Sequence, residues 1–260
     1  MSKSLHFYDA DGNSVHTQPT ESSTAKYPTR PTTVKDALKH GLYPSVTSKI
    51  GIIDNYLLNE WKQKSVIKTA SLNPQRDGEP DEAYFERVTE AAFEQVSDAA
   101  DLGTAIHEAL QLYFTGMVYD PKYTPYVELV DKWVKENKVT FEAHELRLVN
   151  KAYGYAGTTD AAFRCPKGYG IIDFKSTKTK PKKKITNYDS HLLQIAAYHQ
   201  AHFQGFESLA IGCNLYISTT EVGRVEAVWY NDEDLRAAWG AFKHASELWD
   251  YIKGYKAPQL

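Results

Sequence analysis

Apolar positions along this chain recur with one period before residue 140 and with another after it. Between residues 91 and 114 they recur every three or four residues, from Phe93 to Phe114, which predicts one face of a long helix. A second helix is expected at about 122–136. Alternating apolar and polar residues then predict three strands, at 141–149, 154–164 and 168–176, with "CPKGYG" as the turn between the last two.

The segments before this block carry other local signals. "LHFYDADGNSVH" (5–16) favours a small hairpin, and the polar, proline-rich stretch 17–33 favours a linker. Residues 43–70 predict one helix with its cap near Ser45 or Thr47, which ends at the stretch "NPQRDGEPDE".

Helices and strands alternate again after the three strands. We expect a helix at 190–203, a strand pair at 208–218 and 224–230, and a closing helix capped by Asn231. The order helix, three strands, helix, strands, helix indicates a mixed sheet with helices packed on it.

Length and charge narrow the class of protein. The 260 residues are enough for one large domain, or for one domain with an extension. The net charge of −3 excludes a protein held to nucleic acid by bulk charge, so any such binding must use a local patch. Cys165 and Cys213 are too few for a four-cysteine zinc or iron–sulfur site, and they suggest a reducing compartment.

No targeting or membrane segment is recognisable. No apolar run approaches the roughly 20 residues of a membrane span. The first 30 residues contain Asp9, Asp11 and Glu21 and lack an apolar core, unlike a signal peptide or a transit peptide. We therefore expect a cytoplasmic protein.

The strand "GYGIIDFKS" carries an acid and an amine on one face. Asp173 and Lys175 stand two residues apart, so their side chains point to the same side. In the expected hairpin, Asp160 on the neighbouring strand approaches Asp173, because paired strands lie about 5 Å apart. Two such carboxylates repel unless a cation or a proton lies between them, and hard oxygen ligands favour Mg²⁺ or Mn²⁺. The plain alternatives are a strand-end ion pair and an acid that faces solvent.

Two helices offer further polar candidates. His107 lies on or beside the apolar stripe of the long helix, as a metal ligand or as an ordinary core residue. "HEALQ" is not the zincin motif, which needs a second histidine four residues later. Gln194 and Tyr198 are four residues apart on one helix face, with His191 and His202 near it. Taken alone, they form the polar edge of a helix that packs on the sheet.

A strand glutamate, a lysine-rich segment and two tyrosines complete the candidates. Glu145 lies in the first of the three strands, where a glutamate is usually solvated. Tyr153 and Tyr155 either stack on unpaired bases or pack in the sheet. The segment "KTKPKKK" follows the Asp-x-Lys strand directly and is either a solvated loop or a phosphate-attracting one. Its lysines are Lys178, Lys180, Lys182, Lys183 and Lys184.

Five short motifs in a fixed order resemble one enzyme family. They are "GTAIH" on a helix, a strand glutamate, "GTTD", "IIDFK" and "QIAAY". The set resembles the RecB-type exonuclease branch of the PD-(D/E)XK nuclease superfamily, over about residues 100–203. "YPSVTSKIG" also resembles the opening segment of small standalone members, many of them phage-encoded. Asp173 stands where many members have Glu, a substitution that the family pattern allows.

The resemblance implies a fold and a role for each residue. The expected fold is α/β: a restriction-endonuclease-like core with a central mixed sheet flanked by helices (91–260), an N-terminal helical region (34–90) and an N-terminal arm and linker (1–33). The metal would be held by His107, Asp160, Asp173 and the backbone carbonyl of Phe174. Lys175 would orient or deprotonate the attacking water, Gln194 and Tyr198 would position the strand and support the site, and Glu145 would help around the metal.

The implied activity is Mg²⁺-dependent hydrolysis of DNA at its ends, with 5′-phosphate products. Mn²⁺ is expected to substitute, and no iron–sulfur cluster is expected. The expected partners are DNA, with single-stranded ends favoured, and a single-strand-annealing or single-strand-binding protein, in recombination, replication or genome processing. A phage-encoded member would work in the host cytoplasm. Two alternatives remain open: a DNA-end-binding module of a recombination complex, and a metal protein unrelated to nucleic acid.

Overall fold

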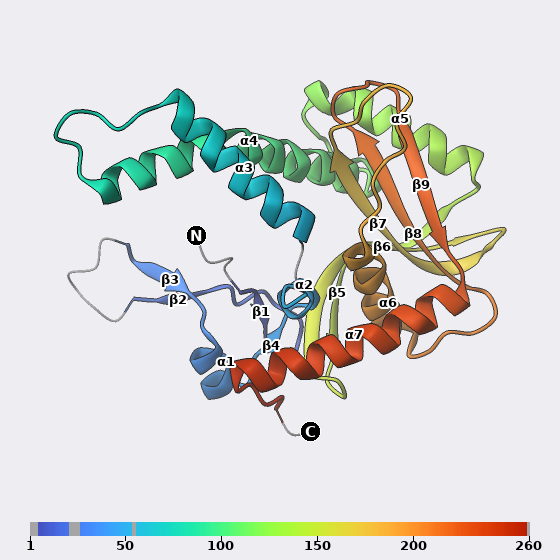
Figure 1. Cartoon of the computed structure of the whole chain (residues 1–260). Coiled ribbons are helices and arrows are strands. Elements are labelled where there is room, and N and C mark those ends of the chain that lie inside the picture. Colours follow the sequence, from blue (N-terminus) through green and yellow to red (C-terminus); the bar gives the residue numbers. More distant parts are fainter. Residues whose placement is uncertain (1–4, 21–26, 54–55, 259–260) are drawn as a thin grey trace.

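A five-stranded mixed sheet lies at the centre of the structure, a computed structural model that describes residues 5–20, 27–53 and 56–258 (Figure 1). The side chains of residue 57 and of residues 95–99 lie outside this description. The strand order is β5-β6-β7-β8-β9. The bounds are Thr140–Asn150 (β5), Tyr155–Cys165 (β6), Gly168–Thr177 (β7), Ala210–Ser218 (β8) and Val225–Tyr230 (β9). All five predicted strands are confirmed, with small shifts at their ends.

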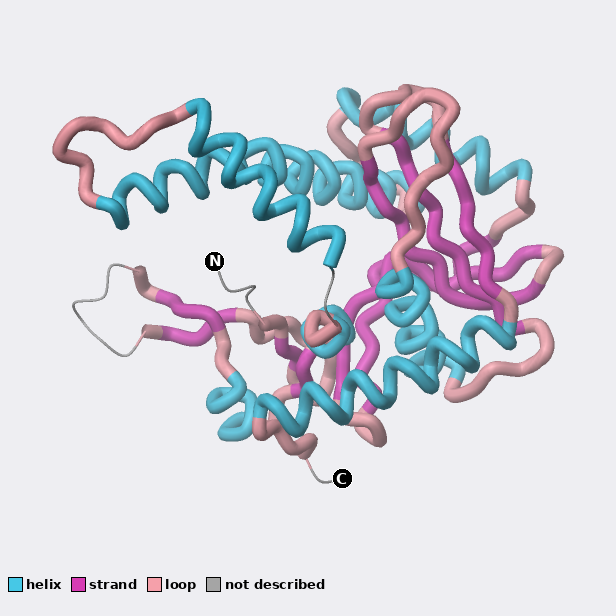
Figure 2. Tube along the Cα trace, in the orientation of Figure 1, coloured by secondary structure: helices cyan, strands magenta, loops and turns pink. Residues whose placement is uncertain are grey.

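Strand directions follow from the connections. The short turns β5–β6, β6–β7 and β8–β9 join antiparallel neighbours, whereas β7 and β8 are parallel. Helix α6 (Asp189–Phe203) lies in the connection between these two parallel strands, as the predicted helix at 190–203 requires. The fold is therefore a mixed α/β sheet with helices on both faces, as Figure 2 shows.

The sheet divides into two branches between β6 and β7. These strands pair from Cys165↔Gly168 to Ala161↔Ile172. Beyond that point β6 continues in register with β5 and β7 continues in register with β8. Asp160 and Asp173 are the next residues on the two strands, so both acids lie at the point where the branches separate. We call this point the fork.

Alternate side chains of the sheet enter two separate cores. Ala162 and Ile171 pack with α6 and with α7 (Asp232–Lys253). Phe163 and Ile172 pack on the opposite face, with α4 (Asp81–Phe114) and α5 (Thr124–Glu136). Both faces are buried, which explains why these strands are mostly apolar and why the polar residues at the fork stand out.

The helices carry the signals that the sequence predicted, with one shift. Asn231 caps α7 in a capping box with Asp234. A short 3₁₀ turn, η1 (Pro121–Tyr123), precedes α5. Helix α4 begins ten residues before the predicted start, because Pro80 precedes it and its first turn carries Asp81 and Glu82, which favour a helix N-terminus.

The prediction of a single helix over residues 43–70 is wrong. Strand β4 (Tyr43–Pro44) comes first, and Ser45 caps α2 (Val46–Ile50), as predicted. Helix α2 ends at Gly51, a residue of poor helix propensity, and α3 (Tyr56–Leu72) starts separately. Residues 54–55 lie outside the described residues. Helices α3 and α4 lie side by side as a hairpin that extends away from the sheet (Figure 1).

The N-terminal arm is more ordered than its composition predicted. Strands β2 (Thr17–Pro19) and β3 (Thr29–Pro31) pair within the stretch expected to be a linker, because β-branched threonines suit an extended backbone. Helix α1 (Val34–His40) follows. The hairpin expected at 5–16 contracts to one bridge between Tyr8 and Ser14, and β1 (Phe7–Tyr8) pairs with β4 instead.

An ion pair with a fully buried lysine joins helix α2 to the last helix, α7. Lys49 of α2 donates to both carboxylate oxygens of Asp250 on α7, at 2.8 and 2.9 Å, and to Ser246. The ammonium also lies over the rings of Trp249 and Tyr255. This pair fixes α2 against α7. None of the described helices is long and apolar enough to cross a membrane.

Candidate active site

The fork brings together the acids that the sequence singled out. The Asp160 carboxylate accepts the backbone N–H of Phe174 at 2.5 Å, and its other oxygen lies 3.2 Å from His107 Nδ1. The Asp173 carboxylate lies 2.6 Å from Lys175 Nζ. The two acids thus lie on adjacent strands, each beside a different basic side chain. The shared face of Asp173 and Lys175 is confirmed by their ion pair, and Asp160 and Asp173 are the residues next to the last β6–β7 pair, Ala161↔Ile172.

Helix α4 delivers His107 to the fork through a close approach at Gly103. A Cβ at Gly103 would lie 2.5 Å from the Ser176 hydroxyl of β7, so the missing side chain lets the helix approach this strand. One turn later, His107 meets Asp160, and its ring lies edge-on to Phe174. His107 is partly exposed, with about 30% of its side chain accessible, so it is not an ordinary core residue.

Helix α6 supports Lys175 from the other side. Lys175 Nζ donates to Gln194 Oε1 at 2.9 Å, and Gln194 Nε2 donates to the Tyr198 hydroxyl at 3.4 Å. The Tyr198 ring covers Gly157 of β6, where a Cβ would lie 2.7 Å from the ring. Gln194 and Tyr198 therefore reach the fork as predicted, and Gly157 provides the space for Tyr198.

Glu145, near the same acids, has an unusual backbone conformation. Its φ of 46° is left-handed inside strand β5, a conformation that a non-glycine residue rarely adopts. Burial, and after it the negative charge of Asp160, raises the pKa of Glu145. Strain of this kind persists where the surroundings enforce it, often at functional sites. Glu145 is the third acid near the fork.

The electrostatics of the two central acids differ. Burial, and next the charge of Asp160, raises the pKa of Asp173 above its usual range, although Lys175 opposes this. Burial also acts on Asp160, but His107 and the Phe174 amide outweigh it and lower the Asp160 pKa. Burial acts against the charged form of His107, yet Asp160 raises the His107 pKa. The fork thus disfavours a second negative charge unless more positive charge is present.

The donor set suits a magnesium ion better than an enclosed metal cage. Across the described ranges, no group of three or more His, Cys, Asp or Glu side chains is arranged to hold a metal by itself. Magnesium is commonly bound by one or two carboxylates, with water and substrate phosphate completing its shell. Asp173 Oδ2 is buried and, among the described residues, has only the ion pair with Lys175 and no hydrogen bond. The two carboxylates fit this chemistry, and the assignment of His107 and of the Phe174 carbonyl as ligands stays a prediction.

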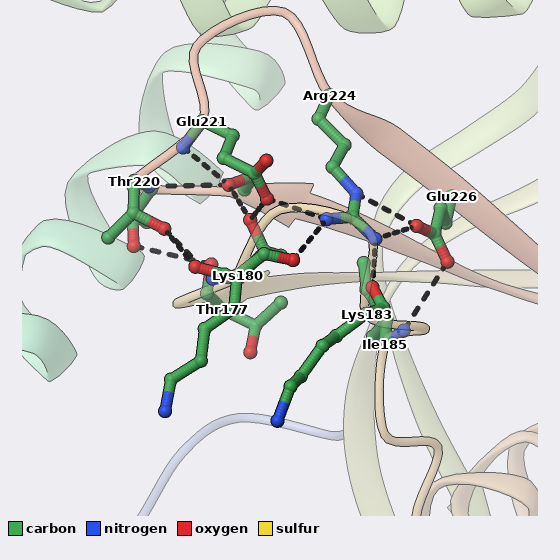
Figure 3. Close-up of polar contacts among 11 residues, drawn as sticks. Thr177, Lys180, Lys183, Ile185, Thr220, Glu221, Arg224 and Glu226 are labelled. Atoms are coloured by element: carbon green, nitrogen blue, oxygen red, sulfur yellow. Dashed lines mark hydrogen bonds and ion pairs between the residues drawn. The ribbon is translucent and has the colours of Figure 1, made fainter.

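The lysine loop, residues 178–184, follows β7 directly. All five of its lysine side chains are exposed. Its backbone is bonded to the turn between β8 and β9, chiefly through Arg224 (Figure 3). Sequence reasoning missed Arg224, because a lone arginine after a glycine carries no local signal of a partner more than 40 residues away.

The two tyrosines have different environments, and one prediction is wrong. Tyr155 is fully buried and donates to the backbone carbonyl of Ala197 at 2.9 Å, so it cannot stack on a base. Tyr153 is 45% exposed and meets Trp239 edge-on. Tyr153 alone stays a candidate for base stacking.

The two α6 histidines that the sequence placed near Gln194 and Tyr198 lie in different environments. His191 bonds the Tyr216 hydroxyl at 2.7 Å, and burial, followed by the charge of Lys175, lowers the His191 pKa to about 4. His202 instead packs edge-on against Phe203. His191 therefore shares the electrostatic environment of Lys175.

Comparisons with known proteins give distant structural similarity. No family model matches the chain, and no curated protein matches it. A crystal structure from Eubacterium rectale, of a protein named "Putative exonuclease", is similar with a TM-score of 0.43 and 11% identity, over 78% of this chain and 86% of that one. The structure of the protein SSO0001 is similar with a TM-score of 0.32 and 16% identity, over 80% and 91%. At this distance neither similarity decides the family.

Proposed function

We propose that this protein is a Mg²⁺-dependent deoxyribonuclease of the RecB-type PD-(D/E)XK kind, which hydrolyses phosphodiester bonds at DNA ends. The observation that carries the proposal is the fork, where Asp160 and Asp173 lie on adjacent strands with Lys175 ion-paired to Asp173. Two acids and an amine from a buried sheet are costly to maintain for stability alone. They suit a reaction in which phosphate charge is neutralised and water becomes a nucleophile.

Each side chain has a task in this reaction. When bound at Asp160 and Asp173, Mg²⁺ would neutralise phosphate charge and make a bound water more acidic. Lys175 orients the attacking water and counters phosphate charge, and Gln194 holds the ammonium in place. His107 fixes the orientation of the Asp160 carboxylate, and departure of the 3′ oxygen leaves a 5′-phosphate.

The lysine loop makes nucleic acid the most suitable substrate class. Lys178 follows Lys175 by three residues, so the loop begins about 10 Å from the site along the extended chain. The rest of the chain is acidic enough to give a net charge of −3, so attraction of a polyanion must come from a local patch. Lysines bind phosphate as point charges and read no sequence, which suits an enzyme that digests DNA of any sequence.

The biological setting remains a further part of the proposal. We propose action on DNA ends in recombination, replication or genome processing, with a single-strand-annealing or single-strand-binding protein as partner. The preference for single-stranded ends now rests on Tyr153, because Tyr155 is buried.

The test is digestion of end-labelled single-stranded and double-stranded DNA with Mg²⁺, beside a circular DNA control. Chelation should stop the reaction, and Ca²⁺ should bind without supporting turnover. A ligase that requires 5′-phosphates should accept the products. Cleavage of linear DNA with intact circles supports an exonuclease. Binding of ends without any cleavage in Mg²⁺ or Mn²⁺ would contradict the proposal and favour the alternative, a DNA-end-binding module.

A further inference from the structure

Arg224, in the turn just before β9, holds the backbone of the lysine loop. Its guanidinium donates to the carbonyl of Lys180 at 3.1 Å and to the carbonyl of Lys183 (Figure 3). It also donates to Glu221 at 2.6 Å and to Glu226 at 2.8 Å. One planar side chain therefore links two points of the loop to Glu221 of the β8–β9 turn and to Glu226 of β9. A lysine cannot do this, because its ammonium is a single point charge.

Other contacts fasten the start of the loop to the same turn. The backbone N–H of Thr179 donates to the Thr220 hydroxyl at 2.9 Å, and that hydroxyl donates to the Thr179 carbonyl at 2.9 Å. The Thr179 hydroxyl lies 2.6 Å from the Ser218 hydroxyl and donates to Glu221. The loop is thus attached by backbone atoms along most of its length.

The attachment leaves the lysine ammonium groups free of acids. Glu221 and Glu226 are both bonded to Arg224, and they also accept from the Thr179 hydroxyl and from the Ile185 N–H just after the loop, respectively. Within the part of the chain that the structure describes, no ion pair involves a lysine of the loop. In Figure 3 the side chains of Lys180 and Lys183 both extend to the same side, away from Arg224. Arg224 bonds the carbonyls of these same two residues.

We propose that Arg224 is a positioning residue that holds the lysine loop in a DNA-binding conformation, with Lys180 and Lys183 presented together to neighbouring phosphates. This inference rests on the proposed function, because it assigns DNA as the polyanion. The physical basis is preorganisation. A loop that is ordered before binding loses less conformational entropy when phosphate binds than a mobile loop does.

The test compares Arg224→Lys and Arg224→Gln with Arg236→Lys as a matched control. Arg236 also donates to a backbone carbonyl, that of Phe206, and to an acid, Asp232, but it lies on α7. Arg224→Lys retains the charge and loses the forked geometry, so it separates positioning from simple attraction. Thr179→Val loosens the loop while Arg224 stays, and circular dichroism melting verifies that each variant folds.

Three measurements follow each variant. Trypsin cleavage within residues 178–184 reports loop order without any DNA. We expect both Arg224 variants to be cut there at least about tenfold faster, as expected when several charge-assisted hydrogen bonds are lost. The Kd for a short single-stranded oligonucleotide and the KM for digestion should rise about fivefold to tenfold, and kcat at saturating DNA should change by less than about twofold. Arg236→Lys should match the wild type, and Thr179→Val should change in the same direction as Arg224→Lys.

The outcomes distinguish this inference from the proposed function. Wild-type trypsin rates in both Arg224 variants would overturn the inference while cleavage of DNA by the wild type stands. Faster trypsin cleavage with an unchanged Kd would also overturn it, because loop order would then have no effect on binding. If Arg224→Lys kept wild-type affinity and Arg224→Gln lost it, charge rather than positioning would be responsible. If the wild type binds DNA but does not cut it, the proposed function fails, and the Kd and trypsin results still decide the role of Arg224.

Discussion

The ammonium of Lys175 lies 2.6 Å from the carboxylate of Asp173 on the same face of β7. The acid is only 5% exposed. Buried ion pairs contribute little net stability, because removing both charges from water costs about as much as their attraction returns. Lys175 also donates to Gln194 of helix α6, at 2.9 Å. A pair this constrained, at the point where the sheet divides, is better explained by chemistry than by stability.

Asp173→Asn should lower the rate of Mg²⁺-dependent DNA cleavage by at least about a hundredfold, while the protein stays folded. The change removes one charge at nearly constant volume, and it removes the repulsion from Asp160 together with the attraction to Lys175. The melting temperature should therefore stay within about 5 °C of the wild type. Asp160→Asn should behave alike. Asp120→Asn is the control, since Asp120 pairs with Lys122 on the surface. Wild-type cleavage by Asp173→Asn in Mg²⁺ would show that the site is assigned wrongly.

His107→Ala should weaken the response to metal more than it weakens the fold. His107 lies 3.2 Å from Asp160 and is partly exposed, so its loss frees the carboxylate without opening a large core cavity. Loss of a side chain that orients a metal ligand typically costs 10-fold to 100-fold in metal affinity. The Mg²⁺ concentration for half-maximal cleavage should rise by roughly that factor, and extra Mn²⁺ should restore part of the activity. A lower melting temperature with an unaltered metal titration would instead identify a purely structural residue.

Gly157→Ala should disturb catalysis through Tyr198. The added methyl would lie 2.7 Å from the Tyr198 ring, so the ring must move, and Gln194 and Lys175 are bonded to it in succession. Overpacking of this kind costs about 1–3 kcal/mol, and kcat should fall by roughly tenfold or more if Lys175 is displaced. Gly240→Ala in α7 meets nothing within 4 Å and should keep full activity with equal or higher stability. An unchanged kcat in Gly157→Ala would show that Tyr198 does not support the active site.

The sequence predicts the elements that depend on local signals. Asn231 and Ser45 cap their helices, and the β6–β7 hairpin forms at "CPKGYG". The register of this hairpin also places Asp160 and Asp173 next to its last pair, Ala161↔Ile172. The failures share a different cause. Buried Tyr155 donates a hydrogen bond to Ala197, which is 42 residues away in the sequence. Arg224 binds carbonyls of the lysine loop that are 41 and 44 residues away in the sequence.

Such contacts depend on the assembled sheet and leave no periodic pattern in the chain. The break after α2 is of the same kind. Gly51 permits a break, but the pattern around it also suits a continuing helix. Helix α2 packs against α6 and α7, whereas α3 packs against α4, in the hairpin that extends away from the sheet.

Changing Lys182, Lys183 and Lys184 together to Ala should weaken DNA binding about equally for every sequence. All three side chains are exposed and follow the active-site strand, so each can contact one phosphate. Each lost phosphate contact lowers the salt slope by nearly one unit, so the slope should fall by roughly one to three. Cleavage at saturating DNA should be nearly unchanged, because the fork is intact. The control triple, Lys39, Lys253 and Lys256 to Ala, removes the same charge elsewhere on the surface. Equal losses in both triples would mean that total charge, not this loop, controls binding.

Acid should destabilise the fold through His199, a buried histidine on α6. His199 is fully buried between Phe203 and Phe206, with ring centroids at 4.6 and 5.1 Å. Burial above all, and then His202, lowers the His199 pKa to about 4, against about 6.5 in the unfolded chain. Between these two pH values the unfolded state binds a proton that the native state does not. The stability from neutral His199 is therefore complete above pH 6.5 and is lost as the pH falls toward 4.

The size and origin of this loss can be measured. The difference between the pKa of His199 in the native state and in the unfolded chain corresponds to about 3 kcal/mol of stability across the full pH window. His199→Phe retains an aromatic ring and removes the titrating group. Between pH 7 and pH 4.5, the free energy of unfolding measured in urea should therefore fall less in this variant than in the wild type, by most of that amount. Phe203→Leu, which loosens the same packing but leaves His199 in place, should lower the free energy of unfolding at every pH and keep much more of the slope. If the wild type and His199→Phe lose stability in parallel as the pH falls, His199 does not titrate in this window and another group accounts for the acid sensitivity.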